Sequence, residues 1–338
     1  MAGACGDALG YPVEFIFSFA EIAAKYGSSG IIDFDSSSVL SHDAAHDGGA
    51  LISDDTQMTL YTAAALIESD RSGRAVGDLL RDAYVCWYSF QAGCKVDVDT
   101  RFRELQLVEL NQRRAPGNTC LQSLSNVARG QQVVNSSKGC GGIMRVAPIG
   151  LWGASHGWSL EQTARVAGES AEITHCHPLS SYASAACGVI IQQCALAGDI
   201  SAAAFKDIVS KAVDVVECVY GAESAYMSTF KAAVRGAVEC AGSEEADYKV
   251  IESKLGSGWV AEETLAIAIF SVLRHIDDAA GCLVCAVNHG GDSDSTGAVA
   301  GNIIGAIVGA DCIPARMADR VQFKSLILRY ADALCQRR

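Results

Sequence analysis

Two segments far apart in the chain share one order of residues: paired glycines, then oxygen-bearing side chains, then an apolar run. Residues 289–309 read HGGDSDSTGAVAGNIIGAIVG, with five consecutive oxygen-bearing side chains at 292–296. Residues 48–66 read GGALISDDTQMTLYTAAAL, with four such side chains at 53–56. Serine, threonine and aspartate are favoured at helix N-termini, where they accept hydrogen bonds from free N–H groups. One or two such residues satisfy that need, so each segment alone is compatible with helix capping or with a ligand site.

Together, the two segments can supply an all-oxygen metal site. Four carboxylates at one point repel one another strongly unless a cation compensates their charge. Hard divalent cations prefer oxygen ligands, so Mg²⁺ or Mn²⁺ fits this set better than zinc. Two such cations roughly 3.5–4 Å apart would form a binuclear hydrolytic centre. The candidate ligands are Asp54, Asp55, Asp292 and Asp294, with Ser53 and Ser295 as neutral oxygen donors.

The elements that position these residues must bring the two ends of the chain together. Asp55 and Asp292 lie 237 positions apart, so the chain has to return to its beginning to build one site. A prior of roughly 150 residues per domain predicts two domains for this length. The shared site favours instead a single compact helical domain over residues 1–338.

Composition favours helices around a large core. Half of the residues are hydrophobic and 19% are charged, which is typical of a globular protein. Five prolines and many alanines favour helices over a sheet-rich fold. The segment SLEQ at 159–162 has the order of a capping box. The pattern predicts helices over 54–69, 75–92, 159–172, 179–197, 201–219, 222–240, 261–275, 277–288, 294–309 and 315–335, and loops over 27–52, 93–118 and 130–142.

A glycine repeat indicates close packing of the 294–309 helix. Glycines recur every four residues there and so lie along one face. Each costs roughly 1 kcal/mol of helix stability relative to alanine. We therefore expect another helix to pack unusually close to this face, which would place the element at the centre of the molecule. The four residues are Gly297, Gly301, Gly305 and Gly309.

Charge and cysteine usage exclude several classes of function. A net charge of −13 disfavours nucleic acid as a partner, except as a modified substrate, because phosphate backbones are bound mainly by Lys and Arg. The 14 cysteines are scattered singly, which is typical of reduced thiols. The chain shows neither a secretory signal nor about 18 uninterrupted apolar residues. We expect a soluble, cytoplasmic protein with no membrane partner.

Six ordered blocks resemble the ADP-ribosylglycohydrolase family, of the dinitrogenase reductase-activating glycohydrolase and ADP-ribosylhydrolase type. The resemblance spans nearly the whole chain. It implies an all-α, orthogonal helical bundle around a binuclear Mg²⁺ or Mn²⁺ centre, and hydrolytic release of ADP-ribose from a modified protein or small molecule. The blocks are GDALGYPVEF (6–15), ISDDTQM (52–58), RRAPGNTC (113–120), SKGCGGIMRVAPIGL (137–151), THCHP (174–178) and NHGGDSDSTGAVAGNIIGA (288–306).

The resemblance also implies roles for individual residues. The metal ligands fall on the six residues named above, and Asp55, Asp294 and Glu14 are implied as catalytic. Glu14 matches a glutamate close to the metals and the scissile ribose. The glycine-rich block matches a loop that holds the diphosphate, where bare N–H groups approach phosphate oxygens closely. This substrate-binding set comprises Gly139, Cys140, Gly141, Gly142, Ile143, Met144 and His175.

The chain departs from the family pattern in three places. It opens at MAGACGDALG with less of the first helix than relatives have. Cys140 stands where many relatives have asparagine, which affects the hydrogen bonds expected there. In some relatives an acid well after the first metal block has a catalytic role, and the loop KVDVDT, which does not align clearly with that segment, offers Asp97 and Asp99 as candidates for it.

Alternative interpretations remain open from the sequence. Cys282, Cys285 and His289 share helical spacing, but core packing explains them better than zinc. The centre could serve another hydrolase acting on a nucleotide or another ADP-ribose derivative. A non-catalytic binding relative is disfavoured because every metal ligand type is retained. Among acceptors of ADP-ribose, arginine is slightly favoured over serine, nucleic acid or a free metabolite.

Overall fold

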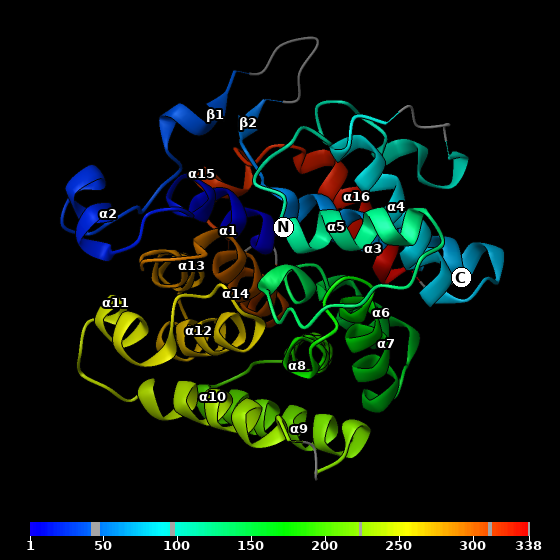
Figure 1. Ribbon diagram of the computed structural model, residues 1–338. Coiled ribbons are helices and arrows are strands. Elements are labelled where there is room, and N and C mark those ends of the chain that lie inside the picture. Colours follow the sequence, from blue (N-terminus) through cyan, green and yellow to red (C-terminus); the bar gives the residue numbers. More distant parts are fainter. Residues whose placement is uncertain (42–47, 95–98, 223–224, 310–312, 337–338) are drawn as a thin grey trace.

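The computed structural model describes residues 1–41, 48–94, 99–222, 225–309 and 313–336, and these form an all-α fold (Figure 1). The α-helices are α1 (Ala2–Gly10), α2 (Phe19–Tyr26), α3 (Asp54–Ser72), α4 (Val76–Gln91), α5 (Asn118–Ala128), α6 (Ala147–His156), α7 (Leu160–Glu172), α8 (Pro178–Leu196), α9 (Ala202–Tyr220), α10 (Met227–Cys240), α11 (Asp247–Val250), α12 (Ala261–Arg274), α13 (Ala279–Val287), α14 (Ser293–Val308), α15 (Ala315–Ala318) and α16 (Lys324–Cys335).

Short elements connect the helices. Two-residue strands β1 (Val39–Leu40) and β2 (Gly49–Ala50) pair antiparallel. The 3₁₀ turns are η1 (Tyr11–Val13), η2 (Ser36–Ser38), η3 (Thr100–Leu105) and η4 (Cys140–Gly142), and η5 (Ile251–Leu255) is a π-helical turn. The sequence prediction of an all-α class is therefore confirmed for the described part of the chain.

Most predicted helices are present, with two corrections. The predicted helix 315–335 is two helices, because Phe323 takes a left-handed conformation with φ of 58° and interrupts it. The helix predicted from 222 begins only at Met227. Helices α1, α2, α5, α6 and α11 were not predicted. Helices α1 and α6 are rich in glycine and alanine and largely buried, so neither shows the polar face on which helical periodicity depends.

Helix α14 lies at the centre of the molecule, beside α1 (Figure 1). Their backbones touch where glycines face each other. A Cβ on Gly297 would lie 2.5 Å from the carbonyl oxygen of Gly6, and one on Gly301 would lie 2.4 Å from that of Ala2. The close-packed face is therefore confirmed for α14. Gly309 is an exception, since it ends the helix with φ of 76° and nothing lies within 4 Å of its Cβ position.

The contact between α1 and α14 joins the beginning and the end of the chain. Helix α14 also packs on α12, α13 and α8, and α16 returns to pack on α3 and α6. A single domain over residues 1–338 stays a prediction, and contacts of this kind between the two ends of the chain are what it expects. Helix α8 is long and apolar enough to span a membrane, but 83% of its most apolar window is buried inside the protein. Its apolar character is accounted for by its position in the core.

Candidate metal centre and substrate pocket

A pocket of about 310 Å³ lies where both ends of the chain meet the glycine-rich loop. The N-termini of α3 and α14, the turn after η1 and the segment around η4 form its walls. Most of the residues predicted for the site are brought together there. The lining includes Glu14, Asp54, Asp55, Gly139, Cys140, Gly141, Met144, His175, Asp292, Asp294 and Ser295.

Three predicted residues lie behind this lining. Ser53 is fully buried, and its Oγ accepts a hydrogen bond from the Asp55 N–H at 3.2 Å, so it caps α3. Gly142 packs against Ser180, and Ile143 is buried in the core. Metal binding by Ser53 stays a prediction, while Gly142 and Ile143 support the loop from behind and do not line the pocket.

Capping does not use up the oxygen-bearing side chains. Ser53 alone caps α3, and Asp292 stands at the N-cap position of α14 without a side-chain capping bond. Thr296 donates its hydroxyl to the Ala286 carbonyl and so serves the backbone. The remaining carboxylates of Asp54, Asp55 and Asp294 are available to the pocket, which favours the ligand-site interpretation over capping.

The paired glycines serve close approach between segments of the chain itself. A Cβ on Gly290 would lie 2.1 Å from the Phe17 carbonyl oxygen. Gly291, with φ of 145°, would place one 2.0 Å from the Ser257 carbonyl oxygen. In the first segment, Gly49 has φ of 131°, and a Cβ there would lie 2.6 Å from the Arg320 carbonyl oxygen. These glycines therefore allow the backbone of other segments to pack directly against them.

The carboxylates are almost completely removed from water. Burial, followed by repulsion from neighbouring acids, raises the pKa of Asp54, Asp55 and Asp294 well above its usual value. The same causes raise the pKa of Glu14 to about 9, with Asp292 the first of its charged neighbours. Without a cation, Glu14 therefore retains its proton at neutral pH.

Two of these carboxylates have an oxygen that is left unsatisfied. Glu14 Oε2 and Asp55 Oδ2 are buried and have no hydrogen-bond partner among the described residues. A buried polar atom without a partner costs about 1–3 kcal/mol, more if it is charged. Crowded carboxylates with unused lone pairs are the donor set that hard divalent cations take. The residues present therefore fit the implied Mg²⁺ or Mn²⁺.

Asp7 is a buried acid that the sequence analysis missed. It lies on α1 and accepts hydrogen bonds from the backbone N–H groups of Ser53 and Thr56 and from the Thr56 hydroxyl. Its carboxylate thus fixes the first turn of α3 and adds negative charge beside Asp54 and Asp55. The available signal was its isolation: it is the one acid in the otherwise small and apolar segment AGACGDALG.

Cys140 makes a direct bond to the acid cluster. Its Sγ donates to Asp292 Oδ2 at 2.7 Å. Burial, and then the charge of Asp292, raises the pKa of the thiol well above its usual value, so it stays a neutral donor. Cys140 therefore provides a hydrogen bond from the glycine-rich loop to the acid cluster.

Glycines in the loop make room for His175. A Cβ on Gly139 would lie 3.2 Å from His175 Nε2, and one on Gly141 would lie 2.9 Å from His175 Cε1. Burial, and then the charge of Arg145, lowers the pKa of His175 to about 3, so the ring is neutral at physiological pH. The loop is held in place by Cys140, whose N–H donates to the Trp259 carbonyl at 3.2 Å.

Some residues that line the pocket were not predicted as site residues from the sequence. Residues 115–120, which comprise a turn and the first residues of α5, also line the pocket and lie inside the block RRAPGNTC. Phe15 and Trp259 also line the pocket, with ring centroids 5.8 Å apart in a stacked arrangement. Phe15 is 60% exposed although it is a large apolar residue. A bulky aromatic residue directly after Glu14 was the signal that could have identified it.

The remaining candidates lie outside the pocket. Asp99 caps η3 and binds Arg101 at 2.6 Å, and it is not among the pocket-lining residues. Asp97 lies outside the described residues. His289 shares a hydrogen bond with Thr296 Oγ1, and no metal-binding group among the described residues combines it with Cys282 and Cys285.

Comparisons with known proteins agree with this all-α class. A family model described as ADP-ribosylglycohydrolase matches residues 1–338. The chain belongs to the ADP-ribosylglycohydrolase family. Membership supports hydrolysis that removes ADP-ribose from modified substrates.

Three relatives illustrate the range of similarity. The ADP-ribosyl-[dinitrogen reductase] glycohydrolase of Rhodospirillum rubrum is 27% identical, over 98% of this chain and 92% of its own length. The uncharacterized protein YegU of Escherichia coli is also 27% identical, over 99% of this chain and 94% of its own length. An uncharacterized protein of Archaeoglobus fulgidus is 30% identical over 59% of this chain and 60% of its own length.

A solved structure shares the fold. The chain titled ADP-ribosylglycohydrolase-related protein complex aligns with a TM-score of 0.64 at 23% identity, over 99% of this chain and 94% of that chain. At this level of identity the likeness establishes the fold alone.

Proposed function

We propose that this protein is a Mg²⁺- or Mn²⁺-dependent hydrolase that releases intact ADP-ribose by cleaving the glycosidic bond at the distal ribose. The observation that supports this most directly is the buried carboxylate cluster, in which Glu14 Oε2 and Asp55 Oδ2 have no partner among the described residues. The substrate is an ADP-ribosylated protein or small molecule.

Two cations would be held by the acids at the two helix N-termini. They would supply Lewis acidity that orients the ribose hydroxyls and makes a nearby water a better nucleophile. Asp7 supports the arrangement from behind by fixing the first turn of α3. The proposed ligands are Asp54, Asp55, Asp292 and Asp294, with Ser53 and Ser295 as neutral donors.

Glu14 is the group that manages a proton at the scissile bond. It lines the pocket, and burial together with Asp292 raises its pKa to about 9. Glycosidic cleavage passes through an oxocarbenium-like state, which nearby carboxylates stabilise while a positioned group transfers the proton. Oε2 of Glu14 is the atom free to hold that proton or to orient the attacking water.

The diphosphate has to be bound by neutral donors or by the cations. None of the described residues lining the pocket is a lysine or arginine. Arg145 is fully buried and donates to Thr174 and to the Ser170 carbonyl, and Lys138 pairs with Glu262. The glycine-rich loop 139–144, through N–H groups other than that of Cys140, and the neutral His175 are therefore the proposed diphosphate site, which keeps the phosphates away from the attacking water.

Arginine is the proposed acceptor. The block SKGCGGIMRVAP resembles the type that acts on dinitrogenase reductase more than the serine-specific type. The Rhodospirillum rubrum relative carries ADP-ribosyl-[dinitrogen reductase] in its name. A cationic guanidinium also suits a pocket lined by carboxylates and lacking Lys or Arg among its described residues.

The test is a hydrolysis panel of ADP-ribosyl-arginine, ADP-ribosyl-serine and ADP-ribosylated nucleic acid, with and without Mg²⁺, analysed by mass spectrometry. The expected product is ADP-ribose, formed only with the cation. Asp55→Ala and Asp294→Ala should each remove most turnover, while the exposed Asp70→Ala on α3 should not. AMP or inorganic phosphate as product would overturn the bond assignment. Cleavage of ADP-ribosyl-serine alone would overturn only the acceptor.

A further inference from the structure

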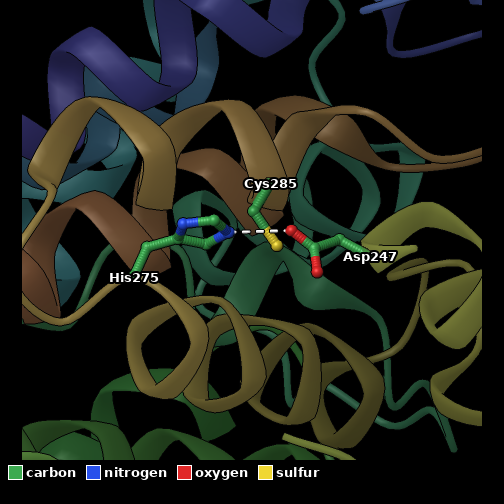
Figure 2. A group of neighbouring side chains, drawn as sticks. All are labelled: Asp247, His275 and Cys285. Carbon is green, nitrogen blue, oxygen red and sulfur yellow. Dashed lines mark hydrogen bonds and ion pairs between the residues drawn. The ribbon is translucent and has the colours of Figure 1, made fainter. Parts of the chain in front are cut away.

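A second group of metal-binding side chains lies apart from the pocket. Asp247 opens α11, His275 directly follows α12, and Cys285 is on α13. Figure 2 shows the three side chains turned toward one another. His275 Nε2 and Asp247 Oδ2 are 2.7 Å apart, and one ligand atom from each residue lies within 4.8 Å of the other two.

Ion pairing alone accounts for only part of this arrangement. Arg274 binds Asp247 Oδ1, with its Nε at 2.9 Å and its Nη2 at 2.8 Å. This leaves Oδ2 directed at His275. Cys285 is 5% exposed, yet its sulfur faces a carboxylate and an imidazole. A cysteine that only filled the core would have no reason to meet two polar ligand groups.

We propose that Asp247, His275 and Cys285 bind a zinc ion, with water completing the coordination. One sulfur, one nitrogen and one oxygen donor suit zinc better than a hard cation such as Mg²⁺. Zinc bonds of about 2.0–2.3 Å place tetrahedral ligands about 3.3–3.8 Å apart, so small side-chain movements within the observed spacing are sufficient.

Charge and neighbouring groups support the same assignment. Burial alone would raise the pKa of Asp247. The hydrogen bond from His275 and the charges of His275 and Arg274 outweigh burial and hold this pKa below its usual value, so the carboxylate is ionised. The side chains of Asp247 and His275 are 23% and 29% exposed, which gives an ion a route of entry.

Zinc at this position would join elements that support the pocket. Helix α13 leads directly into 289–295, which carries Asp292 and Asp294. Helix α12 begins at Ala261, whose N–H donates to the Lys138 carbonyl at the start of the glycine-rich loop. The ion would therefore stabilise the folded protein without contacting substrate, since none of its three ligands lines the pocket. This inference is independent of the proposed function.

The test is a Co²⁺ titration of the full chain with Mg²⁺ in excess, followed by absorption spectroscopy. Co²⁺ replaces zinc and gives a thiolate-to-cobalt charge-transfer band only when a cysteine ligates it. We expect the band in the wild-type protein and in Cys140→Ser, and its loss in Cys285→Ser. Cys140 is the matched control because its thiol also contacts a carboxylate. Absence of the band, or its loss in Cys140→Ser with retention in Cys285→Ser, would overturn the proposal.

A second variant covers the case in which Cys285→Ser does not fold. His275→Gln changes a partly exposed side chain and should weaken Co²⁺ binding at least about tenfold, since even residues behind the ligands contribute that much. Zn²⁺ should raise the Tm of the wild-type protein and leave that of His275→Gln unchanged. Equal Tm shifts in the two proteins would contradict the assignment.

Discussion

At the scale of single residues, Glu14 offers the sharpest test of the proposed chemistry. Glu14→Gln keeps the size of the side chain but removes its proton transfer, so turnover should fall by about 10²–10⁴. Steady-state kinetics on the preferred substrate measures the effect. Glu21→Gln, at an exposed position on α2, is the matched control and should leave turnover unchanged. Near-normal turnover in Glu14→Gln would assign Glu14 a purely structural role.

Asp7 carries a prediction about stability. Asp7→Ala leaves the N–H groups of Ser53 and Thr56 without their acceptor, which should cost about 1–3 kcal/mol of unfolding free energy. Urea denaturation with saturating Mg²⁺ measures this, because the cation removes the repulsion that the substitution would otherwise relieve. Asp70→Ala, exposed on the same helix, should change stability little. Equal stability of the two variants would show that α3 does not depend on Asp7.

The meeting of the four aspartates could be predicted from the sequence, because the two segments share one local order of residues and carboxylates need a common counter-charge. The role of Asp7 could not, since it depends on which backbone N–H groups α1 happens to face. The same limit applies to Asp247, His275 and Cys285, whose ligand atoms come from three separate segments of the chain. The spacing of these residues in the sequence does not predict that they lie close together in the fold.

At the scale of the elements, predictability follows the pattern of exposure. Helices α7 and α9 each have one buried face and one polar face, and their limits were predicted within a residue. Helix α1 is buried along its entire length, so periodicity gives no signal. Residues 319–323 separate α15 from α16 because Phe323 is left-handed, a conformation that its residue type does not predict.

Because α1 and α14 pack so closely, replacing a glycine with alanine at their contact should destabilise the protein. Gly301→Ala would place Cβ 2.4 Å from the Ala2 carbonyl oxygen, so overpacking should cost about 1–3 kcal/mol in urea denaturation. Gly236→Ala on α10 is the matched control, because nothing lies within 4 Å of its Cβ position. It should stabilise the protein by about 0.5–1 kcal/mol. A Gly301→Ala protein as stable as the wild type would refute the tight packing.

At the scale of the whole molecule, stability depends on how the buried acids are neutralised. The folded-state pKa of Glu14 is raised from 4.5 to about 9, so the metal-free folded state binds more protons than the unfolded state between these values. This contribution to stability is complete below pH 4.5 and is lost as the pH rises through about 9. His175 and His289, with pKa values lowered to about 3 and about 4, are neutral in both states well above pH 7.

Metal removal should therefore make stability sensitive to alkaline pH. In EDTA, we expect Tm to fall between about pH 7 and pH 9, because the folded state holds the Glu14 proton that the unfolded state has already lost. Saturating Mg²⁺ should raise Tm and flatten this dependence, because the cations compensate the ionised carboxylates. Differential scanning calorimetry in the two buffers checks both effects. Identical pH dependence with and without Mg²⁺ would show that the acid cluster does not bind the cation.

The contact between the first and last thirds of the chain cannot form until synthesis is nearly complete. At roughly 5–20 residues per second, Asp292 leaves the ribosome roughly 12–47 s after Asp55. Throughout that interval, the partner of α1 in the central contact does not yet exist, so its small apolar face has nothing to cover it. The nascent chain must therefore keep its N-terminal helix exposed until synthesis is nearly finished. Chaperones that shield apolar segments would be needed most by this early part of the protein.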